Sequence, residues 1–194
     1  MLLKDVINNL DEEGFSLLHW NAKEGNAEIV QKLIHKGADL EIKDRKNGST
    51  PLLWACQNGH LNVVKILLQN GANKFATSKR GNTVLHFAVE SGEVELVEML
   101  VKKGLDIDAK KRVNPNVFVK GTLSPLNTAI FEDKMEILTL LIEKGADVNM
   151  VDGLNWTPVN CAIFHGKGFV FATQILVFSI QRKIFQYNPT QLNS

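Results

Sequence analysis

The sequence predicts an all-α solenoid of stacked helix–turn–helix units with β-hairpin connectors. The first observation is a four-residue segment that recurs five times, with successive spacings of 34, 33, 41 and 33 residues. Its copies begin at Ser16, Thr50, Thr83, Ser124 and Thr157. The second observation is a glycine that follows each of the first four copies by 21 residues, at Gly37, Gly71, Gly104 and Gly145. Because one such unit cannot bury its apolar face alone, the units must stack.

Each unit is predicted to contain a short helix, a turn, a longer helix and an extended connector. The Ser or Thr at the head of the unit can cap the first helix by accepting a hydrogen bond from a free backbone N–H. Pro51 and Pro125 follow such a cap, where the missing N–H of proline costs nothing. Gly59 supplies a turn between the two helices, and Gly71 suits the left-handed residue that ends a second helix.

The period of about 33 residues, together with Thr50-Pro51-Leu52-Leu53 and Thr83-Val84-Leu85-His86, resembles the ankyrin repeat. The resemblance covers residues 11–166 and implies a helical solenoid whose general role is to bind another protein. It divides this span into repeats at 11–43, 44–76, 77–109 and 110–150, the last with a loop insertion, and a partial repeat at 151–166.

Two ends and one insertion depart from this repeat. Residues 1–10 predict an N-terminal capping helix, because their apolar residues fall on one helical face. The fourth repeat gains eight residues around Asn114-Pro115-Asn116, which predicts an enlarged loop. Residues 167–194 form a divergent apolar tail with three open interpretations. The tail is a second helix packed on repeat five, the end of a longer or truncated array, or a segment that contacts a membrane.

The charges of the whole chain nearly cancel, since 22 Lys and Arg stand against 21 Asp and Glu. This balance excludes a polyelectrolyte binder of the histone type. Cys56 and Cys161 are too few for a disulfide framework, so we expect a cytoplasmic protein, with the nucleus as an alternative. No run of about 18 apolar residues occurs, and membrane insertion is therefore not expected.

No constellation of residues indicates catalysis, so we expect neither an enzyme nor a small-molecule substrate. Neither cysteine has a second Cys or His at metal-ligand spacing, and no metal or cofactor is expected. The resemblance to ankyrin repeats implies that the rings of His19 and His86 tie turns together. It also implies a modification site, because Asn149 matches the position at which an asparaginyl hydroxylase modifies many ankyrin repeats. An Asn149 that only braces its connector is the alternative.

The resemblance further implies where a partner binds, since partners of ankyrin repeats contact the hairpin tips and the exposed face of each first helix. Carrying these positions over gives a predicted contact set in repeats two to five. Its members are Arg45, Lys46, Ser49, Gln57, Asn58, Lys79, Arg80, Asn82, Glu90, Phe131, Glu132 and Trp156.

Basic residues gather in the three tip windows 43–49, 77–82 and 110–123, where Asp44 is the one acid. They are Lys43, Arg45, Lys46, Lys79, Arg80, Lys110, Lys111, Arg112 and Lys120. Stacking would align these windows into a positive ridge, which favours a partner with an acidic or phosphorylated segment. A rim that only keeps the array soluble is the alternative. Aromatic residues do not interleave the lysines, so nucleic acid is not expected.

These observations lead to one functional hypothesis and one alternative. The chain is expected to be a non-catalytic adaptor, monomeric, that binds another protein through its concave face and hairpin tips. In the alternative it is the recognition arm, a fragment or short form, of a larger ankyrin-containing channel or signalling enzyme.

Overall fold

The computed structural model of the protein describes residues 6–110, 123–152 and 155–187. Within these ranges the chain forms ten helices of seven residues or more. They are α2 (Leu17–Lys23), α3 (Ala27–His35), α4 (Pro51–Gln57), α5 (Leu61–Gln69), α6 (Val84–Ser91), α7 (Val94–Lys102), α8 (Pro125–Phe131), α9 (Met135–Glu143), α10 (Pro158–Phe164) and α11 (Gly168–Tyr187). The all-α architecture predicted from the repeat spacing is confirmed.

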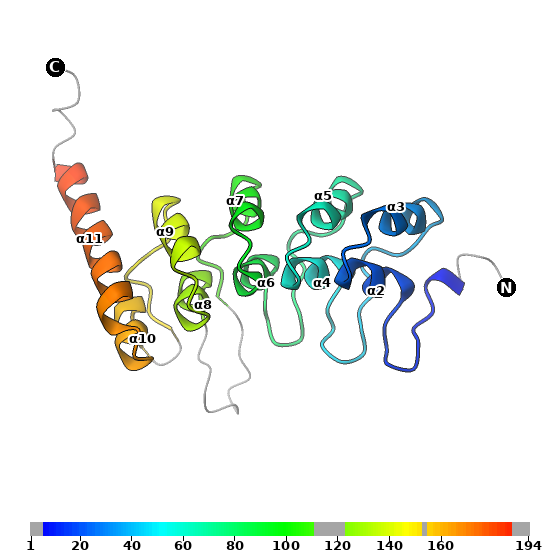
Figure 1. The fold of residues 1–194 in the computed structure, drawn as a ribbon, viewed down its shortest axis with the longest axis horizontal. Helices are drawn as coiled ribbons and strands as arrows, with labels where there is room; N and C mark the ends of the chain where they lie inside the picture. Colours follow the sequence, from blue (N-terminus) through cyan, green and yellow to red (C-terminus); the bar gives the residue numbers. More distant parts are fainter. Residues whose placement is uncertain (1–5, 111–122, 153–154, 188–194) are drawn as a thin grey trace, which may run out of the picture.

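The helices form two rows along an elongated molecule (Figure 1). The first helices of the repeats, α2, α4, α6, α8 and α10, pack against one another in chain order. The second helices α3, α5, α7 and α9 form the other row, and each packs on the first helix of its own repeat. The connectors that precede α4 and α6 project away from the second-helix row, so their tips lie along one edge of the solenoid (Figure 1).

The core is formed where each first helix packs against the next. The sixth position of these helices has no exposed surface in the first four repeats, at Ala22, Cys56, Val89 and Ile130. Burial of an apolar side chain of this size contributes about 1–3 kcal/mol. The stacking of neighbours, rather than the helix propensity of seven-residue segments, therefore holds the repeats together.

The predicted side-chain caps form in repeats one, three, four and five. In two of these repeats a histidine extends the cap to the next connector. The Ser16 hydroxyl accepts a hydrogen bond from the His19 N–H, and Nδ1 of His19 accepts one from the Ser16 N–H. Its Nε2 then donates to the Ser49 carbonyl at 3.0 Å. His86 repeats this arrangement with Thr83 and reaches the Leu123 carbonyl at 2.7 Å. Each ring thus joins two neighbouring repeats.

Repeat two lacks this histidine, because Leu53 stands at the equivalent position. Thr50 still adopts the extended backbone of a cap, yet its side chain accepts no capping hydrogen bond. Its Oγ1 is buried without a hydrogen-bond partner among the described residues. Since an unsatisfied buried hydroxyl costs about 1–3 kcal/mol, this cap is the weakest of the set.

The connectors are hairpin-like loops rather than the regular β-hairpins that were predicted. The loops that precede α2, α4, α6 and α10 are each closed by a backbone hydrogen bond, such as Asp44 N–H to the Ser49 carbonyl and Ser78 N–H to the Asn82 carbonyl. A single isolated bridge, between Thr77 and Thr83, is the extent of β-pairing in the described part of the chain. The loops turn after one closing hydrogen bond, which leaves too few paired residues for a strand.

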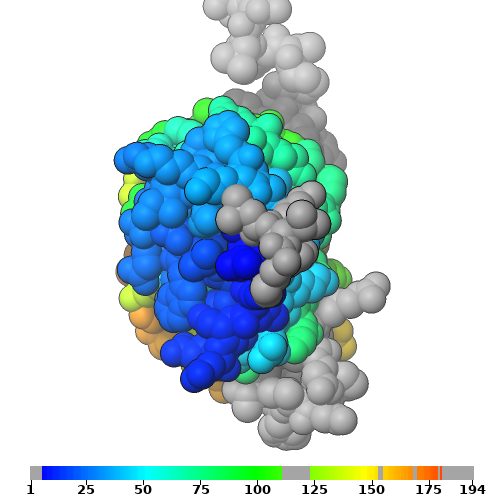
Figure 2. Space-filling view, turned by 90° about the vertical axis from the view of Figure 1, so that its right-hand side faces the viewer, coloured from blue at the N-terminus to red at the C-terminus, as the bar shows by residue number. Residues whose placement is uncertain are grey.

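The ends of the solenoid differ from each other. At the N-terminal end, shown in Figure 2, Ile7 is buried, and the side chain of Asn8 donates to the Gly37 carbonyl and accepts from the Asp39 N–H. At the other end, α11 packs on α10 and α9 and buries Phe171 and Ile175. Residues 1–5 of the predicted capping helix, most of the inserted loop and residues 188–194 of the tail lie outside the described residues.

Candidate partner-binding surface

The tips of the second and third connectors carry four exposed basic residues, Arg45, Lys46, Lys79 and Arg80. The backbone joins adjacent tips, since the Arg45 N–H donates to the Gly14 carbonyl and the Lys79 N–H donates to the Asn47 carbonyl. These hydrogen bonds measure 3.1 and 2.8 Å. The predicted alignment of these two basic tips therefore has a structural cause in the backbone.

Lys79 differs from the other three cations because its ammonium group is engaged within the protein. Its Nζ donates to the Arg45 carbonyl at 2.7 Å. For Arg45, Lys46 and Arg80, by contrast, no carboxylate of the described residues lies within ion-pair distance. Lys43 and Lys110 are also exposed, whereas Lys111, Arg112 and Lys120 lie outside the described residues.

Two members of the predicted contact set are buried, and the structure corrects the prediction for them. Ser49 and Asn82 are 3% and 7% exposed. The Ser49 N–H donates to the Asp44 carboxylate, and the Ser49 carbonyl accepts from His19. The Asn82 N–H donates to the Ser78 hydroxyl. Both residues brace their connector instead of presenting a side chain to a partner.

The face of the first helices between the tips is partly polar. Gln57 and Asn58 are exposed at the end of α4, where the Asn58 amide donates to the Trp54 carbonyl at 2.9 Å. Glu90 is half-buried near the end of α6. Gln57 and Glu90 therefore lie at equivalent places on neighbouring helices, as the repeat register predicts, and Asn58 follows Gln57 directly.

A cation–aromatic cluster on the first two repeats was not predicted. The Lys23 ammonium lies 4.8 Å from the ring centroid of Trp20 and 5.6 Å from that of Trp54. Phe15 contacts both indoles, with ring centroids 5.0 and 5.3 Å apart. Trp20 and Trp54 are 34 residues apart, one repeat, so the repeat register could have placed them side by side.

Two carboxylates fix the indoles of this cluster. Trp20 Nε1 donates to Asp11 at 2.6 Å, and Trp54 Nε1 donates to the buried Asp44 at 3.0 Å. The hydrogen bond from Trp20, followed by that from the Phe15 N–H, lowers the pKa of Asp11. The indoles are thus held in place before any partner arrives, which reduces the ordering cost of binding.

A second aromatic cluster lies on repeats four and five and contains two predicted contact residues. Phe131 contacts His165 edge-on at a centroid distance of 5.2 Å, and Trp156 contacts Phe164 at 4.5 Å. Phe164 and His165 connect the two pairs at 5.4 Å. Phe164 is 69% exposed, and the neighbouring Glu132 is exposed as well. This cluster offers apolar contact area with an adjacent negative charge.

Asn149 is exposed in the connector after α9, as a modification site requires. Its N–H donates to the Asp147 carboxylate at 2.9 Å. This hydrogen bond fits the alternative interpretation equally well, in which the Asn149 segment braces its connector. The hydroxylation of Asn149 stays a prediction.

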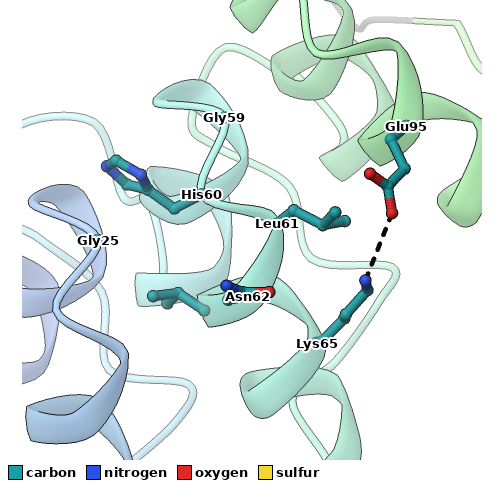
Figure 3. A pocket seen from close by; sticks show the side chains of 8 residues that line it. Gly25, Gly59, His60, Leu61, Asn62, Lys65 and Glu95 are labelled. Atoms are coloured by element: carbon teal, nitrogen blue, oxygen red, sulfur yellow. Dashed lines mark ion pairs between the residues drawn. The ribbon is translucent and has the colours of Figure 1, made fainter.

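An open pocket of about 500 Å³ lies away from the tips, at the turns between first and second helices (Figure 3). The side chains of His60, Lys65 and Glu95 that line it are engaged within the protein. His60 Nε2 meets the Lys23 carbonyl at 2.8 Å, and Lys65 forms an ion pair with Glu95 at 3.6 Å. The pocket thus joins repeats one to three through contacts that are structural.

Both cysteines are free and buried. Burial raises the pKa of the Cys56 thiol, and burial, together with Asp152, raises that of Cys161 to about 12. A buried thiol of high pKa is a poor nucleophile. Among the described residues no group of three His, Cys, Asp or Glu could hold a metal ion. In the same part of the chain, no helix combines the length and the apolar character needed to cross a bilayer.

Comparison with known families agrees with the stacked helix pairs and their tips. A family model described as ankyrin repeats in three copies matches residues 18–111, and one described as ankyrin repeats in many copies matches residues 126–177. The chain belongs to the ankyrin-repeat family. Protein binding is the general role of this family, and the resemblance drawn from the repeat segments is confirmed.

Curated relatives include proteins that are much longer than this chain. A zebrafish putative palmitoyltransferase ZDHHC13 is 30% identical over 179 residues, which cover 78% of this chain and 28% of the relative. The mouse palmitoyltransferase ZDHHC13 is 46% identical over 63 residues, 32% of this chain and 10% of the relative. The mouse B-cell lymphoma 3 protein homolog is 43% identical over 61 residues, 31% of this chain and 14% of the relative. The chain therefore spans less than a third of each of these relatives.

Proposed function

We propose that the protein is a non-catalytic adaptor that binds an acidic or phosphorylated segment of another protein. The observation that carries the proposal is the set of exposed cations Arg45, Lys46 and Arg80 on two hydrogen-bonded tips, without ion-pair partners among the described residues. Cations without internal partners lose no existing ion pair when an anionic segment binds. Their combined field would also speed the encounter with such a segment.

The cation–aromatic cluster of Trp20, Lys23 and Trp54 supports the same proposal. Trp54 donates to Asp44, the acid at the base of the second tip, so the indole lies beside the connector that carries Arg45 and Lys46. Aromatic residues with fixed rings are common anchors of protein interfaces. We therefore place the acidic part of the partner along the tips and an apolar side chain of the partner at the indoles.

Binding of defined peptides tests the proposal. The probe is a fluorescein-labelled peptide of about ten residues with alternating Glu and phosphoserine, and its Lys-containing counterpart serves as the negative peptide. Lys46→Glu with Arg80→Glu should weaken binding of the acidic peptide about tenfold or more, because each reversal changes an attraction into a repulsion. The matched control, Lys36→Glu with Lys103→Glu, makes the same change in net charge at exposed positions away from the tips. Equal affinity of the two double variants would contradict the proposal.

A second candidate function is the recognition arm of a larger protein. The observation that favours it is the similarity to the zebrafish relative, which extends over 78% of this chain but 28% of that protein. An antibody raised against the repeats would detect a species well above 21.6 kDa in the source cells under this alternative. A single species at 21.6 kDa would contradict it. The expectations that the chain is not an enzyme and is cytoplasmic stay predictions.

A further inference from the structure

Two neighbouring first helices, α8 and α10, have nearly the same sequence, and each ends with an exposed phenylalanine. The helices read Pro-Leu-Asn-Thr-Ala-Ile-Phe and Pro-Val-Asn-Cys-Ala-Ile-Phe, and they pack side by side (Figure 1). Phe131 and Phe164 stand at the seventh position of these helices. In the first three repeats the same position is held by Lys23, Gln57 and Glu90. Repeats four and five therefore carry an aromatic ring where the other repeats have a polar side chain.

The exposure of this seventh position does not depend on the end of the repeat array. Phe131 is 39% exposed although repeat five is stacked against its helix, and Gln57 is exposed between repeats one and three. Phe164 is 69% exposed at the same position. The seventh position thus keeps exposed surface inside the stacked array. Exposed apolar side chains that gather in one place, rather than scatter singly, mark a surface for a partner.

Trp156 and His165 complete an aromatic cluster around the two phenylalanines. The ring centroid of Phe164 lies 4.5 Å from that of Trp156 and 5.4 Å from that of His165. Phe131 and His165 are 5.2 Å apart, and all three pairs are edge-on. In an edge-on pair one ring presents only its edge, so at least one ring keeps its π-faces clear of its partner. Such a face carries partial negative charge and attracts a cation.

The first two repeats show a cation bound to such rings within this protein. The Lys23 ammonium lies 4.8 and 5.6 Å from the ring centroids of Trp20 and Trp54. Helices α8 and α10, by contrast, contain no Lys or Arg. No cation of the described residues lies over the rings of Trp156 or Phe164. These two rings are therefore open to a cation from a partner.

Charge favours a cationic occupant over an apolar one. Glu132 follows Phe131 directly, is exposed, and forms no ion pair within the described part of the chain. An apolar side chain on the rings would partly desolvate this carboxylate, whereas a cation can meet the rings and the carboxylate together. Arginine suits both contacts, because its planar guanidinium stacks on aromatic rings and forms two parallel hydrogen bonds with a carboxylate.

We propose that repeats four and five bind an arginine side chain of a partner protein, with the guanidinium stacked on Trp156 and Phe164 and paired with Glu132. This site goes beyond the acidic segment proposed for the tips, and neither contact depends on the other. Together the two contacts set the direction of a bound segment. Its acidic part lies at the tips of repeats two and three, and its arginine lies toward repeat five.

Nuclear magnetic resonance titration of the full chain with N-acetyl-arginine amide tests the proposal. The indole N–H signals of Trp20, Trp54 and Trp156 report on separate places of the surface. The Trp156 signal should shift with a dissociation constant in the millimolar range, as one exposed cation–aromatic contact and one ion pair would give. The signals of Trp20 and Trp54 should stay in place, because Lys23 lies over their rings and both N–H groups are hydrogen-bonded. The citrulline analogue, which has a similar shape without the charge, should bind about fivefold more weakly or less.

Glu132→Gln with Phe164→Leu should raise the dissociation constant of the arginine probe about fivefold or more, since the carboxylate charge and one ring are lost. Both residues are exposed, and the substitutions keep the side chains close to their original size. The matched control, Glu136→Gln with Phe75→Leu, makes the same changes at exposed residues elsewhere and should bind the probe like the wild-type chain.

Three outcomes would overturn the proposal. The first is a Trp156 signal that does not shift, or that shifts equally with arginine and citrulline. The second is equal binding by the wild-type chain and Glu132→Gln with Phe164→Leu. The third is tighter binding of N-acetyl-leucine amide, which would make an apolar side chain the occupant. Lys46→Glu with Arg80→Glu should not weaken arginine binding, so a failure here is distinguishable from a failure of the acidic-segment proposal.

Discussion

Asp133 forms an ion pair with Lys167, the residue that immediately precedes α11. Asp133 stands at the interhelical turn of repeat four, where the other repeats have Gly25, Gly59, Gly92 and Gly166. All five residues have a positive φ, and that of Asp133 is 61°. The turn geometry is thus kept without glycine, and the side chain gained in exchange binds the next repeat.

Asp133→Ala should destabilise the protein by about 1 kcal/mol relative to Asp133→Gly. In this left-handed conformation the Cβ of Ala has a steric cost, and Ala cannot offset it with the ion pair to Lys167. Asn adopts this left-handed backbone readily, so Asp133→Asn removes only the charge and measures the contribution of the ion pair alone. With both side chains partly exposed, we expect that loss to be about 0.5 kcal/mol or less. Urea unfolding at constant pH measures all three variants. A larger loss for Asn than for Ala would contradict the backbone explanation.

Gly25→Ala should cost more stability than Gly71→Ala, although both glycines have a positive φ. A Cβ at Gly25 would lie 2.7 Å from Nδ1 of His60, while one at Gly71 meets nothing within 4 Å. Gly71→Ala thus measures the left-handed penalty alone, about 1 kcal/mol, and Gly25→Ala adds a clash. Adding His60→Ala to Gly25→Ala should relieve the clash. Equal unfolding midpoints for the two single variants would show that His60 moves aside freely.

Acidification should destabilise the protein in part through His19. Burial, opposed by the hydrogen bond to the Ser49 carbonyl and by Asp44, holds the pKa of His19 below its ordinary value in the folded chain. The unfolded chain therefore binds the proton more readily, and stability is lost as the pH falls below about 6.5. His19→Asn, which copies the residue of repeats four and five, should show a smaller loss between about pH 7.5 and 5.5. An unchanged pH dependence in thermal melts would exclude His19 as a contributor.

Leu53→His should stabilise repeat two by about 0.5–1.5 kcal/mol. The new ring would take the place that His19 and His86 have in their repeats and would provide a partner for the buried Thr50 Oγ1. Thr50→Val separates the effect of satisfying the Thr50 hydroxyl from the effect of replacing Leu53. It removes the unsatisfied hydroxyl while Leu53 stays in place, and its own effect on stability should be nearly neutral. If Leu53→His proves destabilising in guanidinium unfolding, the loss of Leu packing outweighs the gained hydrogen bond.

The repeat period predicted the helices and their order because the cap, turn and stacking positions recur at fixed spacings. In repeat five one of these positions departs from the pattern, and the second helix changes its length for a local reason. The glycine that ends earlier second helices is replaced by Phe178 in repeat five, 21 residues after Thr157. Without a residue suited to the left-handed conformation, α11 continues to Tyr187.

The repeat register predicted where the candidate site residues lie, but it did not predict that Ser49 and Asn82 are buried. Arg45, Lys46 and Arg80 lie on exposed tips as expected, because tip residues follow directly from the register. The burial of Ser49 depends on the ring of His19 in the preceding repeat, a contact between segments 30 residues apart. The placement of Lys23 between Trp20 and Trp54 depends on side-chain conformations, which no spacing rule supplies.

The central claim is that the basic tips attract an acidic partner, and the salt dependence of the association rate tests it most directly. Stopped-flow mixing with the Glu–phosphoserine peptide should show a rate constant that falls at least about tenfold between 0.05 and 0.5 M salt, since the Debye length shortens about threefold. Lys46→Glu with Arg80→Glu should flatten this dependence, and Lys36→Glu with Lys103→Glu should preserve it. An association rate that is equally fast at low and high salt would contradict the claim.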